Sequence, residues 1–185
     1  MDFFVLMGWV EALLRDLGAA KPRFVAEKAN PSYHPGRCAK VYVGETCVGV
    51  LGQIHPLVAV NYGVDAEFFC AELSFDALSA VKGARPVYRP LPRFPSVTRD
   101  IAVVCRASVP VGEMIDCIMA SGGQYLKDCQ LFDVYMGSHI AGGMKSVAFS
   151  LTMRSDDQTL TDEHAEETVA KVLKALGEKF GAVMR

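Results

Sequence analysis

The segment RPVYRPLPRFPSVTRDIAVV, residues 85–104, gathers residue types that could bind a polyanion. Between positions 85 and 106 there are five arginines and one acidic residue, Asp100. Guanidinium groups bind phosphate oxygens, and an aromatic ring such as that of Phe94 can stack on a base. Residues 154–167 have the opposite balance, with one arginine and six acidic residues. The first segment could therefore face phosphates and the second would repel them, although both could also be ordinary solvated surfaces.

The sequence predicts no catalytic set and no metal site. It lacks a glycine-rich phosphate loop and a G-x-S-x-G motif, and Asp156 and Asp157 have no histidine at a useful spacing. Zinc and redox sites need closely spaced ligands, but the four histidines form no cluster and the cysteines form no C-x-x-C pair. We therefore expect the cysteines to be small core residues. They are Cys38, Cys47, Cys70, Cys105, Cys117 and Cys129.

The composition is that of an ordinary globular chain. Hydrophobic residues make up 51% and charged residues 22% of the 185 positions. No apolar run approaches the roughly 18 residues that a membrane-spanning helix needs. The N-terminal stretch lacks the basic region and small-residue cleavage site of a signal peptide. We therefore expect a cytoplasmic protein with no membrane partner and with room for one large domain or two small ones.

The first half of the chain is predicted to form an antiparallel sheet with helices at its margins. Apolar residues recur with helical spacing over residues 3–17, and Gly18 is a natural helix stop. Gly44 and Glu45 form a hairpin-length connection between two strand-like segments. The expected strands are 23–29, 39–43, 46–54 and 67–75, and the expected short helices are 56–61 and 76–81.

A proline-rich linker at residues 85–92 is predicted to separate this first domain, residues 1–84, from a second domain at residues 93–185. Each proline removes a backbone donor and fixes φ, which excludes a helix or a central strand there. The second domain has the order β-α-β-β-α-β, which is the ferredoxin-like order with both helices on one face of an antiparallel sheet. Its strands are expected at 99–105, 126–135, 145–153 and 182–184, and its helices at 111–120 and 161–180. The predicted fold class is therefore α+β.

Alternation within residues 145–153 predicts that one face of the second sheet is uncovered. Large apolar residues would point to the helices, and the small or polar residues between them would form the other face. The expected helix-facing residues are Val147, Phe149, Leu151 and Met153, together with Ile101, Val103, Phe132 and Val134. The uncovered face is expected to carry Ala102, Val104, Leu131, Asp133, Tyr135, Ser146, Ala148 and Ser150.

Four-stranded sheets of this order often bind RNA through exposed aromatic rings and bordering basic residues. Tyr135 is the one aromatic residue of the predicted face, and the alternative is that Tyr135 and Phe94 pack against a neighbouring domain. A further possible anion contact is Arg37 in the HPGR turn, for which a salt bridge is the simpler expectation. The predicted RNA-binding residues are Arg89, Arg93, Phe94, Arg99, Tyr135, Lys145 and Ser146.

Several phrases resemble, in the correct order, the C-terminal region of the bacterial phenylalanyl-tRNA synthetase beta chain. In the first half they include HPGRCA at residues 34–39 and GVLGQIHP at residues 49–56. In the second half they include FPSVTRDIA at 94–102, LFDVY at 131–135, GMKSVA at 143–148 and TLTD at 159–162. The resemblance extends over nearly the whole chain.

This resemblance implies that residues 1–84 are the end of a non-catalytic domain with an antiparallel sheet of the class II synthetase type. It implies that residues 93–185 are a ferredoxin-fold anticodon-binding domain. The family enzyme is an α2β2 assembly that joins phenylalanine to its tRNA with ATP and magnesium, and its aminoacylation site lies in the alpha chain. The chain would therefore contribute subunit packing and a grip on the anticodon stem-loop, with tRNA(Phe) and the alpha subunit as partners. The resemblance implies no catalytic residue and no bound cofactor for these residues.

A second class of function stays open beside this one. Other domains of the β-α-β-β-α-β order bind small ligands such as amino acids, so a regulatory ligand-binding module is the alternative. A stand-alone enzyme is disfavoured, because no nucleophile, base and orienting group converge in the sequence.

Overall fold

The computed structural model describes residues 2–81, 83, 87–88, 90–137 and 140–185. The chain divides into two compact units, Met1–Tyr88 and Arg89–Arg185. Residues 85, 86 and 89 of the predicted linker lie outside the described residues. Within the described ranges, no helix has both the length and the apolar character needed to cross a bilayer.

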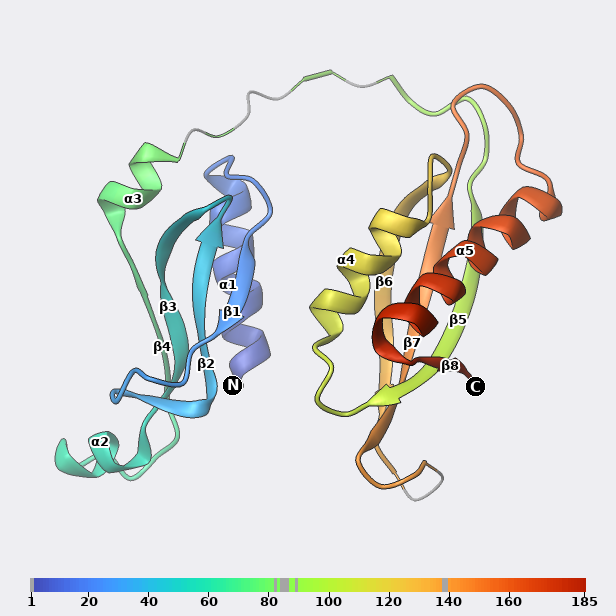
Figure 1. Ribbon diagram of the computed structural model, residues 1–185. Helices are drawn as coiled ribbons and strands as arrows, with labels where there is room; N and C mark the ends of the chain where they lie inside the picture. The colour runs from blue at the N-terminus through green and yellow to red at the C-terminus, as the bar shows by residue number, and fades with distance from the viewer. Residues whose placement is uncertain (1, 82, 84–86, 89, 138–139) are drawn as a thin grey trace. The chain divides into compact units, whose positions relative to one another are not determined.

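The first unit contains a four-stranded antiparallel sheet in the order β1-β2-β3-β4, with helices beside it (Figure 1). Strand β2 begins at Tyr33, earlier than predicted, and takes in the HPGR segment that was expected to be a turn. A register shift between Tyr33 and Cys38 accommodates this segment within the strand pair. The elements are α1 (Phe3–Asp16), β1 (Arg23–Ala26), β2 (Tyr33–Val43), β3 (Thr46–Ile54), α2 (Pro56–Asn61), β4 (Phe69–Leu73) and α3 (Phe75–Ala80).

Helix α1 holds one face of the first sheet in a hydrophobic core. It begins at an Asp2 cap, whose side chain accepts a hydrogen bond from the Val5 N–H at 2.9 Å. Leu6, Val10 and Leu14 recur at a spacing of four, so they share one side of the helix. They are buried together with the sheet residues Val41, Val43, Val48 and Leu51.

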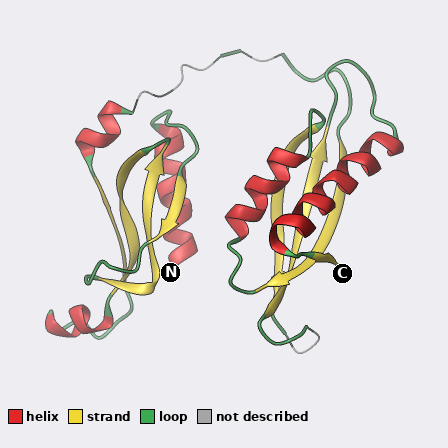
Figure 2. Ribbon diagram, viewed as in Figure 1, coloured by secondary structure: helices red, strands yellow, loops and turns green. Residues whose placement is uncertain are grey.

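The second unit has the predicted β-α-β-β-α-β order, and its antiparallel sheet runs β6-β7-β5-β8. Both helices lie on the same side of this sheet (Figures 1 and 2). The elements are β5 (Val97–Arg106), α4 (Val111–Ser121), β6 (Leu126–Tyr135), β7 (Met144–Met153), α5 (Asp162–Phe180) and β8 (Val183–Met184). The predicted α+β class and ferredoxin-like order are confirmed.

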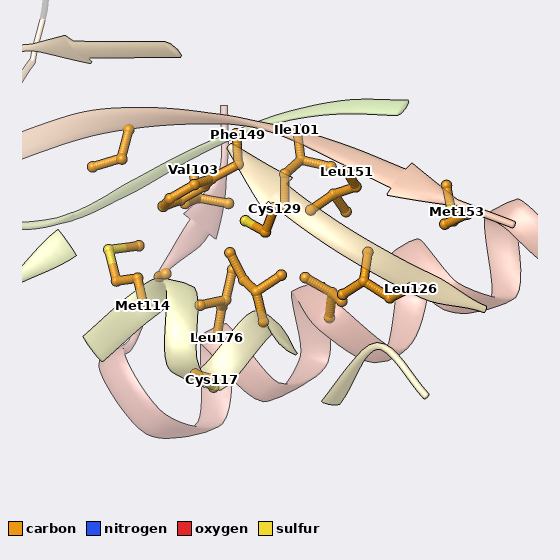
Figure 3. Close-up of a cluster of buried hydrophobic side chains, with 14 of the residues drawn as sticks. Ile101, Val103, Met114, Cys117, Leu126, Cys129, Phe149, Leu151, Met153 and Leu176 are labelled. Carbon is orange, nitrogen blue, oxygen red and sulfur yellow. The ribbon is translucent and has the colours of Figure 1, made fainter. Parts of the chain in front are cut away.

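The core of the second unit lies between the sheet and its two helices (Figure 3). Strand β7 contributes every second residue to it, as the alternation predicted. Val147, Phe149, Leu151 and Met153 are all 0% exposed. Met114 of α4 and Leu176 of α5 are also 0% exposed and close the other side of the core. The helix-facing side of the sheet is therefore buried in the core.

Helix α5 has specific start and stop signals. Thr161 and His164 form a capping box, in which His164 Nδ1 accepts a hydrogen bond from the Thr161 N–H at 3.4 Å. Gly181 ends the helix in the left-handed region, at φ 63°, a conformation that glycine adopts without strain. Its N–H donates to the Gly177 carbonyl at 2.9 Å. These ends position strand β8, which follows immediately.

Candidate nucleic-acid interface

Strand register decides which side chains lie on the uncovered face of the second sheet. Residues directly opposite each other in antiparallel strands share a face. Ile101 and Val103 pair with the core residues Phe149 and Val147, so they lie on the helix-covered face. The alternate residues form five rows on the uncovered face. The rows are Thr98–Thr152–Asp128, Asp100–Ser150–Gln130, Ala102–Ala148–Asp133, Val183–Val104–Ser146–Tyr135 and Arg106–Met144.

Tyr135 is the aromatic residue of this face and the last residue of β6. It pairs with Ser146 of β7, as predicted for the uncovered face. A Cβ atom added at Gly137 would lie 2.2 Å from the Tyr135 hydroxyl oxygen, so a side chain there would require the ring or the chain to shift. The fold therefore places an aromatic ring at one end of the face.

The floor beside Tyr135 is made of small side chains that are buried. Ser146 and Ala148 are 4% and 8% exposed, although both helices of the second unit lie on the other side of its sheet (Figure 1). The guanidinium carbon of Arg185 lies 5.8 Å from the centre of the Tyr135 ring, within the range of a cation–π contact. Strands β5 and β7 lie between β8 and β6, so the contact spans the floor. Long side chains from the two edges thus cover the small residues between them.

Charged side chains divide the uncovered face into two ends. Arg106 is exposed at the end of β5 and pairs with Met144, which places it near the Tyr135 end. Asp133 is exposed on the same face, in the row next to Tyr135. Asp100 and Asp128 lie farther along the strands. One end therefore combines an aromatic ring, a hydroxyl, a carboxylate and two cations, whereas the other end is polar and acidic.

Comparison with known protein families identifies the domain that carries this face. Residues 92–185, more than half of the chain, match the family model described as "Ferredoxin-fold anticodon binding domain". The chain belongs to the ferredoxin-fold anticodon binding domain family. Residues 1–75, ahead of the anticodon binding domain, match the model described as "Phenylalanyl tRNA synthetase beta chain CLM domain".

Similar proteins carry the same two regions. The beta subunit of phenylalanine–tRNA ligase from Clostridium acetobutylicum is 40% identical over 185 residues, covering 100% of this chain and 23% of the relative. The corresponding subunit from Symbiobacterium thermophilum is 44% identical over 179 residues, covering 95% of this chain and 20% of the relative. That from Bacillus subtilis is 40% identical over 185 residues. The predicted relationship to the synthetase beta chain is confirmed, and the chain spans between 20% and 23% of these relatives.

The anticodon binding domain places Lys145 away from the predicted interface. Lys145 pairs with Cys105, a core residue, so it lies on the helix-covered face. It is 7% exposed, and its Nζ donates a hydrogen bond to the Val109 carbonyl. We therefore correct its assignment: its ammonium group is used inside the domain and is not available to a phosphate.

Arg99 is also turned toward the helices. It pairs with Leu151, a core residue, and its Nη2 forms an ion pair with Asp162 in the first turn of α5. Val104 in the Tyr135 row lies five positions farther along β5, about 17 Å away at ~3.4 Å per residue. Arg99 therefore links β5 to α5 and does not join Tyr135 at one site.

The remaining predicted contacts precede β5. Arg93 is exposed and Phe94 is half-buried in this segment, whereas Arg89 lies outside the described residues. Of the predicted RNA-binding residues within the described part of the chain, Tyr135 and Ser146 are the two that share a row.

A bulge in β6 overturns the predicted faces of two residues. The register shifts between Leu131 and Asp133, so Leu131 pairs with the core residue Phe149 and lies on the helix-covered side. Phe132 is the extra residue of this bulge and is 58% exposed. An inserted residue reverses the alternation, which is why Leu131 was assigned to the wrong face.

Sequence reasoning did not include Arg106 and Arg185 among the site residues. The position of Arg106 follows from alternation, because it comes two residues after Val104 on β5. The position of Arg185 depends on the pairing of β8 with β5, which is long-range and has no local sequence signal. Two cations of the anticodon binding domain were therefore missed for different reasons.

The first unit holds its own candidate residues in internal contacts. Arg37 Nη1 donates to Gln53 Oε1 at 2.6 Å and lies 3.5 Å from Glu67 Oε1, which confirms the expected salt bridge.

Cys47 and Cys70 are exposed, so the prediction that the cysteines are core residues is wrong for these two; the other four are buried. In the described residues, no group of three or more His, Cys, Asp or Glu side chains could hold a metal ion. These residues do not fit a magnesium site, and no reaction step is assigned to them.

Proposed function

We propose that the chain works as part of the beta subunit of a phenylalanine–tRNA ligase and binds the anticodon stem-loop of tRNA(Phe). The observation that carries this proposal is the gathering of Tyr135, Ser146, Asp133 and Arg106 at one end of an uncovered sheet face. The description of the matching family model supports the class of ligand. The printed names of the relatives support the enzyme.

The chemistry of these residues suits an unstacked base in a single-stranded loop. The Tyr135 ring offers a stacking surface, which any base can use. The Asp133 carboxylate accepts hydrogen bonds from base N–H groups, and the Ser146 hydroxyl can donate or accept one. Arg106 and Arg185 can contact the backbone phosphates beside the base. A base on this surface would therefore meet both a stacking partner and polar groups that recognise its edge.

The arginines before β5 extend the proposed contact. Arg93 is exposed there, and Arg89 is kept as a proposed phosphate contact from the sequence. Phe94, which is half-buried, is kept as a proposed contact at the base of this segment. These residues would track the RNA backbone and add affinity without selecting a base.

The first unit is proposed to pack within the assembled synthetase. Its helix α1 buries Leu6, Val10 and Leu14 but leaves Phe4 71% and Trp9 60% exposed. Such apolar exposure fits a surface that another part of the enzyme covers. The proposed partner is the synthetase alpha subunit, in an α2β2 assembly that uses ATP and magnesium in the cytoplasm. Aminoacylation is assigned to that assembly and not to a residue of this chain.

Binding of a labelled anticodon stem-loop RNA to the chain tests the proposal. Tyr135→Ala should weaken binding by about 1–3 kcal/mol, or about 5- to 150-fold, because one base loses its stacking partner. Fluorescence anisotropy at low salt measures the affinity. The matched control is Tyr62→Ala, which removes a tyrosine that is 82% exposed in the first unit. It should bind as the wild type does.

Equal affinity of Tyr135→Ala and the wild-type chain would contradict the proposed interface. The competing function, a regulatory amino-acid site, makes a different prediction. Phenylalanine would then raise the melting temperature of the chain, while the stem-loop would have no effect on it. A thermal-shift series with phenylalanine and with the RNA therefore separates the two.

A further inference from the structure

Two histidines of the first unit, each followed by a proline, make the same contact with the backbone. His34 Nδ1 accepts a hydrogen bond from the Gly36 N–H at 3.0 Å. His55 Nδ1 accepts one from the Leu57 N–H at 3.2 Å. In both cases the imidazole reaches past the proline to the N–H two residues later, as an Asn or Asp side chain does in an Asx turn. The proposed RNA surface uses neither contact.

Strand pairing brings these two turns to one corner of the first sheet. Tyr33 at the start of β2 pairs with Ile54 at the end of β3. Each histidine directly follows one member of this pair. The His55 N–H also donates to the Ser32 carbonyl at 2.9 Å, so the two chains remain hydrogen-bonded beyond the pair. The turns at His34 and His55 therefore belong to one local structure.

Helix α2 depends on the His55 side chain for its start. It has six residues, with His55 as N-cap, a proline in its first turn and no acidic residue there. The His55 carbonyl accepts hydrogen bonds from the N–H groups of Val58 and Ala59 at 2.9 and 3.1 Å. The imidazole accepts the one from Leu57. Because so short a helix is marginal by itself, loss of this cap should open its first turn.

Only a neutral imidazole can make these contacts. Its Nδ1 has a free lone pair when the proton is on Nε2, whereas a protonated ring is a donor at both nitrogens. A protonated His55 would aim an N–H at the Leu57 N–H and would place a positive charge at the positive end of α2. The folded turns therefore favour the neutral form. Their contribution to stability is present at high pH and is lost as pH falls from 8 to 5, the range in which imidazole gains its proton.

The charged groups around this corner largely offset each other. Arg37 Nη1 lies 3.5 Å from Glu67 Oε1, so the effect of one on an imidazolium opposes that of the other. Burial raises the pKa of Tyr33 to about 12, so this neighbour of His34 is neutral between pH 5 and 8. The backbone N–H groups therefore decide the balance. The titratable and charged groups on the elements around the two turns are Tyr33, Arg37, Tyr62, Asp65, Glu67 and Cys70.

We infer that His34 and His55 form an acid-sensitive switch, in which neutral imidazoles hold the HPGR segment and the first turn of α2, and protonation releases both. The inference is independent of RNA binding and goes beyond the proposed function. Helix α2 carries two large apolar side chains at its surface, Leu57 at 68% and Val60 at 69% exposure. Acidification therefore changes the presentation of an apolar surface of the first unit, while the second unit keeps its fold.

An NMR titration of the whole chain from pH 8 to pH 5 at constant salt tests the switch. The 13Cα shifts of residues 56–61 report the ratio of helical to open α2, which should fall on the order of 5-fold as the cap is lost. His55→Asn keeps a capping oxygen that gains no proton in this range, so its α2 should stay helical. His34→Asn should likewise make the Gly36 amide resonance insensitive to acid.

The matched control is His164→Gln, which removes a histidine of the second unit whose Nδ1 contacts Thr161. Its α2 should respond to acid as in the wild type. If α2 loses its helical shifts equally in wild type and in His55→Asn, another group drives the change and the switch is overturned. Imidazole 15N shifts of the wild-type chain at pH 8 give a test without substitution. Both rings should carry their proton on Nε2, and a proton on Nδ1 of either ring would also overturn the switch.

Discussion

Each compact unit contains a four-stranded antiparallel sheet with helices packed on one face and cations on the other, yet the cations are held differently. In the first sheet, Lys40 forms an ion pair with Glu27 at 2.7 Å, and the Arg23 guanidinium lies 5.0 Å from the Tyr42 ring of the adjacent strand. The bond to Lys40 lowers the pKa of Glu27, and the same bond raises the pKa of Lys40. The first sheet therefore satisfies its cations between neighbouring strands.

In the second sheet the cations lie around a floor of small residues. Arg106 is exposed at the end of β5, and Arg185 crosses the floor to a ring on the opposite edge. Arg185 therefore covers small residues on two strands, whereas Lys40 of the first sheet is held by an ion pair with Glu27. Under the proposed function, the neighbours of the basic residues, and not their number, distinguish the second sheet from the first.

The largest expected effect comes from removing a buried side chain on the helix-covered face of the second sheet. Phe149→Ala should lower the free energy of unfolding of the second unit by about 3–5 kcal/mol, because a large, fully buried side chain leaves a cavity. Urea denaturation with amide hydrogen exchange of β5, β6 and β7 measures the loss. The matched control is Ser150→Ala, one residue along the same strand on the uncovered face, which should change stability by less than about 0.5 kcal/mol. Similar losses in the two variants would contradict the assignment of faces.

Sequence alone could predict most of this fold for a physical reason. Strand β7 alternates between large apolar and small residues, so Val147 and Phe149 identify the covered face without any structure. The same alternation places Arg99 with Ile101 and Lys145 with Val147, on the covered side, and these two assignments were available from the sequence. The positive charge of Arg99 and Lys145 had instead suggested that both contact RNA.

Two features could not be read from the sequence. The bulge between Leu131 and Asp133 adds one residue to β6, and nothing local in the phrase LFDVY marks it. The contact of Arg185 with Tyr135 depends on the strand order β6-β7-β5-β8, which brings together residues 50 positions apart in the chain. Local patterns determine the faces of single strands, but the proposed interface depends on long-range strand pairing.

Lys145 tests whether a buried cation of the second sheet is structural. Lys145→Ala should destabilise the second unit by about 1–3 kcal/mol, because the Val109 carbonyl loses its donor. Stem-loop affinity, measured where the variant is folded, should stay within about twofold of the wild type. Urea denaturation and anisotropy provide the two measurements. A large loss of RNA affinity at unchanged stability would instead return Lys145 to the interface.

The pKa of Tyr33 tests whether its hydroxyl is buried against the first sheet. Burial, followed by the charge of a nearby Cys70 thiolate, raises the pKa of Tyr33 from 10.0 to about 12. The folded state therefore holds this proton more tightly than the unfolded state. Its contribution to stability is complete below pH 10 and is lost as pH rises from 10 toward about 12. Tyr33→Phe cannot ionise, so it should lose less stability across that window, as measured by urea denaturation at each pH.

The same change at Tyr62, which is 82% exposed, serves as the control for Tyr33. Tyr62→Phe should follow the alkaline profile of the wild-type chain. If Tyr33→Phe and Tyr62→Phe lose the same stability as pH rises, the Tyr33 hydroxyl is not buried against the first sheet.

The smallest expected effect compares one cation from each sheet directly. Arg106→Ala should reduce the slope of log affinity against log salt by about 0.7 to 0.9, because one phosphate contact no longer releases a counterion. Lys40→Ala removes the same charge from the first sheet, where Glu27 already neutralises it. It should leave the slope unchanged. Stem-loop titrations from low to moderate salt measure both slopes. Equal reductions in the two variants would mean that the RNA responds to the net charge of the chain, and the distinction between the two sheets would then fail.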